Sequence, residues 1–263
     1  MNRKRPVVLC LSGHDPSGGA GIQADIEALL SHRCHPCCVI TALTEQDTGN
    51  VYRLNPQRPE DVLAQAQRIL NDMPVDSIKI GLLGHAETAQ AIAEILHRHP
   101  AIPVVLDPVL AAGGGASLAN GDLLQAILQL LPLCTIVTPN SEEARKLAPD
   151  ADSLEQCGAE LSTTGCDYVL ITGTHENTAS VSNRLFQQGR CIETFTWNRL
   201  PESYHGSGCT LAAAIAALLA QRLDPVHAIQ EAQEYTWNSL AAGYRPGQGQ
   251  HLPNRLYWMD EEL

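Results

Sequence analysis

The sequence predicts a three-layer α/β/α domain, with a mainly parallel sheet and a β-hairpin at one edge of that sheet. Short β-branched, apolar runs alternate with amphipathic stretches along most of the 263 residues, a pattern typical of parallel sheets covered by helices on both faces. Composition agrees: 44% of the residues are hydrophobic but only 4% are aromatic, and aliphatic side chains suit helices packed on such a sheet. Because no Pro-, Gly- or Ser-rich linker divides the chain, we expect residues 1–263 to form a single domain.

Each strand is predicted from a short apolar run that ends at a glycine or a polar residue. In chain order these runs are residues 6–12, 37–43, 77–83, 102–109, 134–140 and 167–174. Each helix is predicted from apolar residues at helical spacing. In chain order the helices are 18–33, 58–73, 85–99, 121–131, 141–148, 153–165, 205–221 and 224–244. Between residues 178 and 197, two alternating runs flank the turn "QQGR", which predicts the edge hairpin.

Charge and cysteine content exclude several classes of protein. The formal net charge of −12 argues against binding to a nucleic-acid backbone or to an anionic membrane surface. No segment approaches the roughly 20 apolar residues of a spanning helix, and the first residues lack the apolar run of a signal peptide. Nine cysteines, an odd number, indicate a reducing cytoplasm. Cys34 and Cys37 form a CxxC without a second ligand pair, so we interpret them as buried or loop cysteines rather than a zinc or redox site.

Glycines and polar residues gather where the predicted strands end, which is where ligands bind in open α/β sheets. The first strand ends in "SGHDPSGGAG", residues 12–21, and the helix near the C-terminus opens with "HGSGC", residues 205–209. Backbone N–H groups of glycine-rich turns, together with a helix N-terminus, bind phosphate groups. Two such loops, with polar strand ends between them, predict a phosphate-binding site at this edge of the sheet.

Five stretches resemble hydroxymethylpyrimidine and phosphomethylpyrimidine kinases of thiamine biosynthesis, which belong to the ribokinase-like superfamily. They are "SGHDPSGGAGIQADI", "VITALTEQDTGNV", "VVLDPV", "TPNSEEA" and "HGSGCTLAAAIAALL". The resemblance implies a ribokinase-like fold and an enzyme that uses ATP and Mg²⁺ to phosphorylate 4-amino-5-hydroxymethyl-2-methylpyrimidine, and then its monophosphate. A homodimer is a further expectation, since homodimers are common in such families. Two alternatives stay open, a pyridoxal or pyridoxine kinase of the same superfamily and a non-catalytic relative that binds the pyrimidine.

The resemblance implies that an anion hole opens the helix at 205–221. Backbone N–H groups of Gly206, Ser207, Gly208 and Cys209 would face the charge on the transferring phosphoryl group. Cys209 is the expected catalytic base, and the field of the helix would lower its thiol pKa. The alternative interpretation of Cys209 is a small apolar residue beneath a helix start.

A second set of residues is expected at the pyrimidine. The resemblance places Asp25 and Gln46 against the ring, where a carboxylate and an amide can pair with its amino group and ring nitrogens. Gly13, Ala20 and Thr44 are expected in the same subsite. Without the resemblance, Asp25 would be interpreted as a solvated helix residue and Gln46 as a polar residue at a loop tip.

A third set is expected at the nucleotide and the metal ion. The residues that the resemblance places near nucleotide or phosphate are Asp107, Thr138, Asn140, Thr172 and Gly173, and those near Mg²⁺ are Asp107 and Glu143. The spacing of Asn140 and Glu143 puts both at one face of a helix start, which suits a hydrated Mg²⁺. Glu142 is the alternative acid. The same spacing is also typical of a capping box, and both interpretations can hold together.

The sequence departs from the family at three places. Thr172 stands where relatives have a lysine expected to touch nucleotide phosphates, and the sequence leaves open whether Lys79 or Lys146 replaces it, whether Mg²⁺ carries more of the charge, or whether activity is reduced. The Gly-rich run at 110–120 also lacks a family lysine, and we expect it to form a flap over the site. His14 replaces a common threonine.

Overall fold

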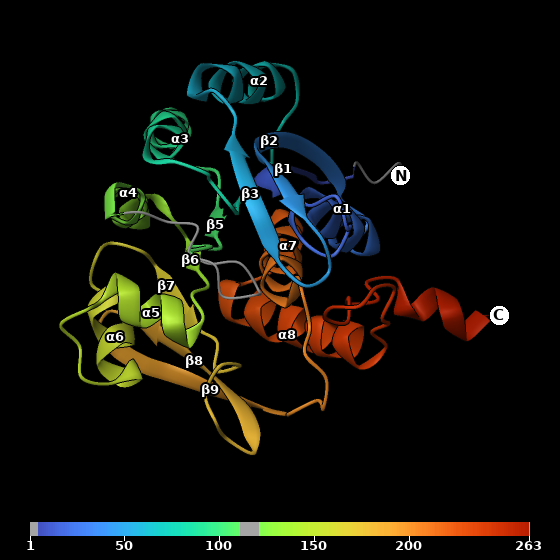
Figure 1. Ribbon diagram of the computed structural model, residues 1–263. Helices are drawn as coiled ribbons and strands as arrows, with labels where there is room; N and C mark the ends of the chain where they lie inside the picture. Colours follow the sequence, from blue (N-terminus) through green and yellow to red (C-terminus); the bar gives the residue numbers. More distant parts are fainter. Residues whose placement is uncertain (1–4, 111–120, 263) are drawn as a thin grey trace.

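In a computed structural model that describes residues 5–110 and 121–262, nine strands form one continuous sheet (Figure 1). Their order is β3-β2-β1-β4-β5-β6-β7-β8-β9. The strands from β2 to β7 pair in parallel, whereas β3, β8 and β9 pair antiparallel at the two edges. The bounds are β1 Val7–His14, β2 His35–Gln46, β3 Val51–Pro56, β4 Ser77–Ile80, β5 Val104–Leu106, β6 Ile136–Val137, β7 Tyr168–Ile171, β8 Ser180–Gln187 and β9 Arg190–Asn198. This sheet and its β8–β9 edge hairpin confirm the predicted fold class.

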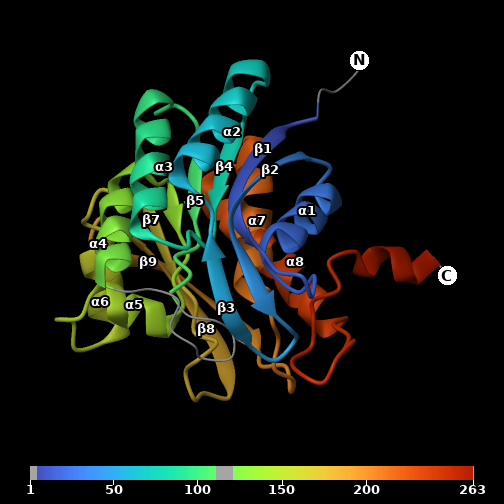
Figure 2. The same ribbon diagram turned by 45° about the horizontal axis from the view of Figure 1, so that its top comes forward.

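Helices cover both faces of the sheet (Figure 2). One face packs against α2 to α6, and the other against α1, α7 and α8. The bounds are α1 Gly21–Ser31, α2 Pro59–Asp72, α3 Ala86–Arg98, α4 Gly121–Leu130, α5 Ser141–Leu147, α6 Leu154–Leu161, α7 Ser207–Ala220 and α8 Pro225–Ala241, with short 3₁₀ helices at Leu131–Leu133 and Tyr257–Glu262. None of the helices in the described part of the chain has the length and apolar character needed to cross a membrane.

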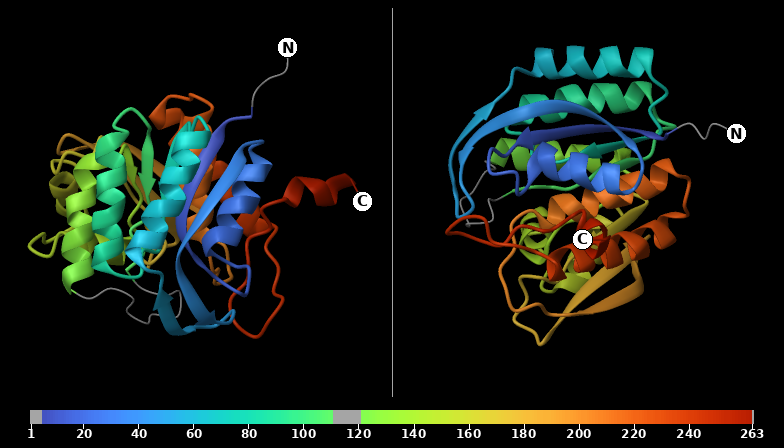
Figure 3. Two further views of the ribbon diagram at one scale, coloured as in Figure 1. Left: turned by 90° about the horizontal axis from the view of Figure 1, so that it is seen from above. Right: turned by 90° about the vertical axis from the view of Figure 1, so that its right-hand side faces the viewer.

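The core divides into two clusters because side chains of a strand alternate between the faces of the sheet. Along β1, Leu9 and Leu11 join the cluster beneath α2 to α6, whereas Val8 and Cys10 join the cluster beneath α1, α7 and α8. Helix α7 is buried from Thr210 to Ala220, as expected for a helix that is apolar all round. It lies between the sheet and α8 (Figure 3), and it brings the "HGSGC" loop to the carboxyl ends of the parallel strands.

Two expectations differ from the structure or fall outside it. Strand β2 continues to Gln46 and pairs with β3, so the segment after residue 43 forms a second edge hairpin that the sequence analysis did not predict. The reason is that β3 turns most of its side chains to solvent, which removes the apolar alternation from which strands are predicted. The proposed flap at 110–120 lies almost entirely outside the described residues.

Candidate active site

A cavity of about 450 Å³ lies at the carboxyl ends of the parallel strands, within the usual size range of small-molecule sites. Both glycine loops contribute to its wall, together with the ends of β1, β2, β6 and β7. The predicted site residues on this wall are Gly13, Ala20, Thr44, Gln46, Asp107, Thr138, Asn140, Glu143, Thr172, Gly206, Ser207, Gly208 and Cys209. Asp25 and Gly173 are not on it. The roles of all these residues stay predictions.

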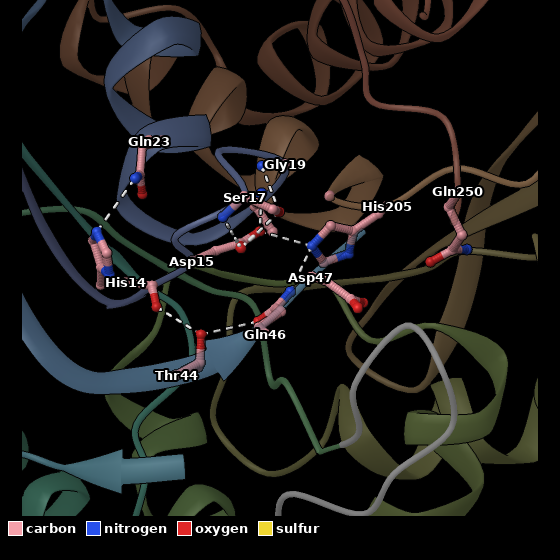
Figure 4. Close-up of polar contacts among 12 residues, drawn as sticks. His14, Asp15, Ser17, Gly19, Gln23, Thr44, Gln46, Asp47, His205 and Gln250 are labelled. Atoms are coloured by element: carbon pink, nitrogen blue, oxygen red, sulfur yellow. Dashed lines mark hydrogen bonds and ion pairs between the residues drawn. The ribbon is translucent and has the colours of Figure 1, made fainter. Parts of the chain in front are cut away.

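Asp15 shapes the loop between β1 and α1 (Figure 4). Its Oδ1 accepts hydrogen bonds from the Ser17 backbone N–H at 2.8 Å and from the Ser17 hydroxyl at 2.7 Å. Its Oδ2 accepts from the Ala20 N–H at 2.9 Å and lies 2.8 Å from His205 Nε2. Burial acts to raise the pKa of Asp15, but the hydrogen bonds from His205 and Ser17 outweigh it and hold the pKa below its ordinary value. Asp15 is therefore an ionised anchor between the two glycine loops.

The second glycine loop packs directly on the first. Gly206 is the N-cap of α7 and has a φ of +89°, which glycine adopts at no steric cost. A Cβ at this position would lie 1.9 Å from the Gly19 carbonyl oxygen, so a larger residue would push the loops apart. The next N–H groups belong to the first turn of a helix, where they have no intrahelical partner and favour an anion.

Cys209 lies in that first turn, half-buried on the cavity wall. Burial raises the pKa of the thiol to about 12; the charge of Lys79 lowers it, while those of Asp107 and Asp25 raise it further. The expectation of a lowered pKa is therefore wrong, because burial and two neighbouring carboxylates outweigh the helix field.

Asp25 lies beneath the cavity instead of on its wall. Its side chain is fully buried, and Oδ1 lies 2.8 Å from Nζ of Lys79, which is fully buried as well. Lys79 also donates to the Ser12 hydroxyl at 2.9 Å. Burial acts to lower the pKa of Lys79, but the charges of Asp25, Cys209, Asp107 and Cys10 together outweigh it and raise the pKa above its ordinary value. The structure thus places Asp25 in a buried ion pair rather than against a ligand, and Lys79 is not on the wall either.

Asp107 and Glu143 are two buried carboxylates on the cavity wall. Burial raises the pKa of Asp107 to about 6 and that of Glu143 to about 8, and the charge of Asp107 contributes to the second shift. Asn140 and Glu143 form the capping box: Asn140 Oδ1 accepts from the Glu143 N–H at 2.9 Å, and Glu143 Oε2 accepts from the Asn140 N–H at 2.9 Å. Asn140 Oδ1 also accepts from the Glu142 N–H at 3.0 Å, so both of its lone pairs are used. Glu143 Oε2 keeps a second lone pair that is available to a cation.

The described residues contain no cluster of three or more His, Cys, Asp or Glu side chains suited to a metal ion. A pair of carboxylates fits Mg²⁺ nevertheless, since this ion is commonly held by one or two carboxylates and substrate phosphates, with water in the other positions. A cation held there would also offset the charge of Asp107, which adds to the effect of burial in raising the pKa of Glu143.

The position of the missing lysine is occupied by Thr172, which lies on the wall. Gly173 is not on the cavity wall, and its backbone N–H donates to Asn183 Oδ1 at 3.0 Å. In the part of the chain that the structure describes, Arg199 is the only lysine or arginine on the wall. Its guanidinium donates to the carbonyl oxygens of Thr174, Glu176 and Thr178 at 2.7–2.9 Å, so it stands beside the Thr172 strand end.

A smaller cavity of about 130 Å³ adjoins the first. The two share several residues, among them Thr172, Arg199 and Ser207. Its outer part is apolar and includes Trp197 and Trp237, whose rings stack with centroids 6.5 Å apart. Together the two cavities form one chamber at the N-terminus of α7, with an aromatic extension at Trp197 and Trp237.

Sequence reasoning missed three residues of the site. Asp15 and His205 stand inside the two glycine motifs, and His205 could have been noticed as the polar residue that opens "HGSGC". Arg199 follows the hairpin and carries no local motif, so only the fold brings it to the cavity.

The family model described as phosphomethylpyrimidine kinase matches residues 15–254. The chain belongs to the phosphomethylpyrimidine kinase family. A hydroxymethylpyrimidine/phosphomethylpyrimidine kinase of Escherichia coli is 37% identical over 247 residues, which cover 90% of this chain and 92% of the relative. Among solved structures, a Bacillus subtilis pyridoxal kinase in complex with ADP matches with a TM-score of 0.89 and 25% identity, over 97% of this chain and 99% of that one. A Clostridium difficile phosphomethylpyrimidine kinase matches with a TM-score of 0.77 and 27% identity, over 90% and 100%.

Proposed function

We propose that this protein transfers the γ-phosphoryl group of ATP to the hydroxymethyl group of 4-amino-5-hydroxymethyl-2-methylpyrimidine, and then a second phosphoryl group to the monophosphate, for thiamine biosynthesis. The observation that carries the proposal is the meeting of the two glycine loops at one cavity, with Cys209 at the first turn of α7. Positioning and electrostatic stabilisation dominate phosphoryl transfer, and this geometry provides both.

The reacting groups would meet at the N-terminus of α7. The N–H groups of Ser207, Gly208 and Cys209 stabilise the charge that develops on the phosphoryl group. Because burial raises the Cys209 pKa to about 12, the thiol is protonated at neutral pH. It acts as a base only from its thiolate form, which the charge of Lys79 favours and which would take up the proton of the substrate hydroxyl. Mg²⁺, held through Glu143 and Asp107, would neutralise phosphate charge.

ATP would extend from the anion hole toward the aromatic cavity, with its base near Trp197 and Trp237. We propose that Arg199 supplies the phosphate-facing cation that Thr172 cannot. Among the residues that the structure describes, it is the only lysine or arginine on the cavity wall. In that case Arg199→Met raises KM for ATP more than it lowers kcat. A change in kcat alone, with KM for ATP unaffected, would assign Arg199 only to the loop that it holds.

The direct test is incubation of the purified protein with Mg-ATP and the pyrimidine, with products followed by mass spectrometry. Pyridoxal serves as the competing substrate and Cys209→Ala as the control variant. Mono- and then diphosphate from the pyrimidine, with loss of turnover in the variant, would support both substrate and base. Phosphate on pyridoxal alone would reassign the substrate, and pyrimidine binding without turnover would indicate a non-catalytic relative.

We also propose that residues 1–263 act as one kinase domain in the cytoplasm and pair as a homodimer. The continuous sheet supports a single domain. All nine cysteines are unpaired, which suits a reducing compartment. Light scattering on the purified protein measures the oligomeric state, and a mass of one chain would refute the dimer.

A further inference from the structure

A chain of hydrogen bonds passes through the side-chain amide of Gln46 (Figure 4). At one end, His205 Nε2 lies 2.8 Å from Asp15 Oδ2 and 2.8 Å from the nearer amide atom of Gln46. At the other end, Thr44 Oγ1 lies 3.1 Å from the farther amide atom and 2.9 Å from the His14 carbonyl oxygen. The side chains of Thr44, Gln46 and His205 all line the large cavity.

The Asp15 end of the chain fixes a proton on His205. Asp15 is ionised, since its hydrogen bonds hold its pKa below the ordinary value, and an ionised carboxylate only accepts. A separation of 2.8 Å from His205 Nε2 therefore requires a proton on that nitrogen. Nε2 carries this proton whether the ring is neutral or charged, so the result is the same for both states.

The atom of Gln46 that faces this N–H must then be an acceptor, which is Oε1. The structure draws the amide nitrogen toward His205, an arrangement that would oppose two donors. The oxygen and nitrogen of an amide are assigned from the hydrogen-bond network and not from their positions. The hydrogen bond between Asp15 and His205 thus requires the oxygen and nitrogen of the Gln46 amide to be exchanged, with Oε1 toward His205.

The Thr44 end requires the same orientation independently. A hydroxyl has one proton, and Thr44 directs it to the carbonyl oxygen of His14 at 2.9 Å. Toward Gln46 its oxygen can therefore only accept, so the amide atom at 3.1 Å must be Nε2. With Oε1 toward His205 and Nε2 toward Thr44, all four contacts pair a donor with an acceptor, because the single His205 Nε2 proton is shared between Asp15 Oδ2 and Gln46 Oε1.

We propose that His205 is a specificity-determining residue that, with Thr44, locks the Gln46 amide so that the cavity recognises a ring nitrogen beside an amino group. Locked in this way, Gln46 has one Nε2 proton and one Oε1 lone pair left for the ligand, in a single order. A 4-aminopyrimidine offers an acceptor nitrogen and an amino donor. Its 4-oxo analogue offers an N–H donor and a carbonyl acceptor, the reverse order. This inference rests on the proposed function.

The test is calorimetric titration, without ATP, of 4-amino-5-hydroxymethyl-2-methylpyrimidine and of its 4-oxo analogue. The wild-type protein should bind the amino ring more tightly. In His205→Leu and in Thr44→Val, the amide is held at one end only, so turning it over costs one hydrogen bond fewer than in the wild type. The ratio of the two Kd values should therefore shrink by about tenfold, the effect of one hydrogen bond of ordinary strength. His205→Gln and Thr44→Ser restore the donor and the acceptor, so they should keep the ratio near that of the wild type.

An equal loss of affinity for both rings in His205→Leu and Thr44→Val, with an unchanged ratio, would overturn the proposal and leave these residues a structural role. Thr44→Val decides the matter alone if His205→Leu fails to fold. Failure of the proposed function is distinguishable, because the wild-type protein would then neither bind nor phosphorylate the amino ring. Binding and turnover of that ring with an unchanged ratio would refute only the inference.

Discussion

At the scale of single residues, Glu143 gives the metal-free protein a stability that depends on pH. Its pKa is raised to about 8 by burial and by the charge of Asp107, so the folded chain holds a proton there more tightly than the unfolded chain does. Stability should therefore fall as pH rises from about 4.5 to 8. In Glu143→Gln the group cannot ionise, and we expect the variant to gain on the wild type by up to about 1.4 kcal/mol per pH unit across this range.

Urea unfolding of the metal-free protein at pH 5, 6, 7 and 8 would measure this difference. Glu142→Gln is the matched control, because Glu142 is the exposed neighbour in the same helical turn, and its curve should run parallel to that of the wild type. A constant difference between Glu143→Gln and the wild type at all four pH values would contradict the prediction.

The residues that line the cavity follow mostly from local sequence, whereas their chemical state does not. Glycine loops and strand-end carboxylates have local patterns, so Gly206 and Asp107 could be placed at the site before the fold was known. Asp25 could not, because its partner Lys79 is far away in the chain and meets it only in the core. The pKa of Cys209 depends on burial and on two carboxylates from other elements, which no spacing reveals.

At the scale of elements, Asp15 stabilises the loop that joins β1 to α1. It is 4% exposed and accepts hydrogen bonds from Ser17, Ala20 and His205. Asp15→Ala leaves those donors without their acceptor. We expect it to lower the free energy of unfolding by roughly 2–4 kcal/mol and to lower kcat/KM, since the loop lines the cavity.

Asp47 provides the comparison, since its Oδ1 accepts from the Gly49 and Asn50 N–H groups at 2.8 and 2.9 Å in the turn between β2 and β3. This turn is solvent-exposed, so Asp47→Ala should destabilise the protein far less than Asp15→Ala. Chemical denaturation of both variants would measure the two losses in the free energy of unfolding. Equal losses would mean that the burial of Asp15 does not strengthen the contribution of its hydrogen bonds to stability.

The two edge hairpins show why one element was predicted and the other was not. The β8–β9 hairpin has a Gln188–Gly189 turn in which both residues have positive φ, and β8 buries Leu185 and Phe186. Its apolar pattern and its turn are therefore visible in the sequence. Strand β3 lacks such a buried face, since its order comes from backbone pairing with β2, and backbone hydrogen bonds leave no pattern in the sequence.

At the scale of the whole molecule, the segment after α8 returns to the site and fastens both glycine loops. Arg255, 2% exposed, donates from Nε to the Thr210 hydroxyl at 2.8 Å, from Nη1 to Glu27 at 3.0 Å and from Nη2 to the Gly19 carbonyl oxygen. One guanidinium thus joins the first glycine loop, α1 and α7. The sequence gives no hint of this role, because all three partners are distant in the chain.

Arg255→Met should therefore affect stability and catalysis together. Arg255→Met leaves the Thr210 hydroxyl and the Gly19 carbonyl oxygen without a donor, whereas Glu27 is 44% exposed and stays solvated, so we expect a cost of roughly 2–4 kcal/mol. The change also frees Gly19 to move relative to Gly206. We expect a loss of that size in urea unfolding and, at a temperature where the variant stays folded, a lower kcat/KM. Arg255→Lys keeps the charge, but a single ammonium cannot reach three partners as a planar guanidinium does. Its free energy of unfolding and its kcat/KM should therefore lie between those of the wild type and of Arg255→Met. If Arg255→Met lost stability but kept full kcat/KM, the two loops would hold their positions without this connection, and the close approach of Gly19 and Gly206 would be sufficient to build the anion hole.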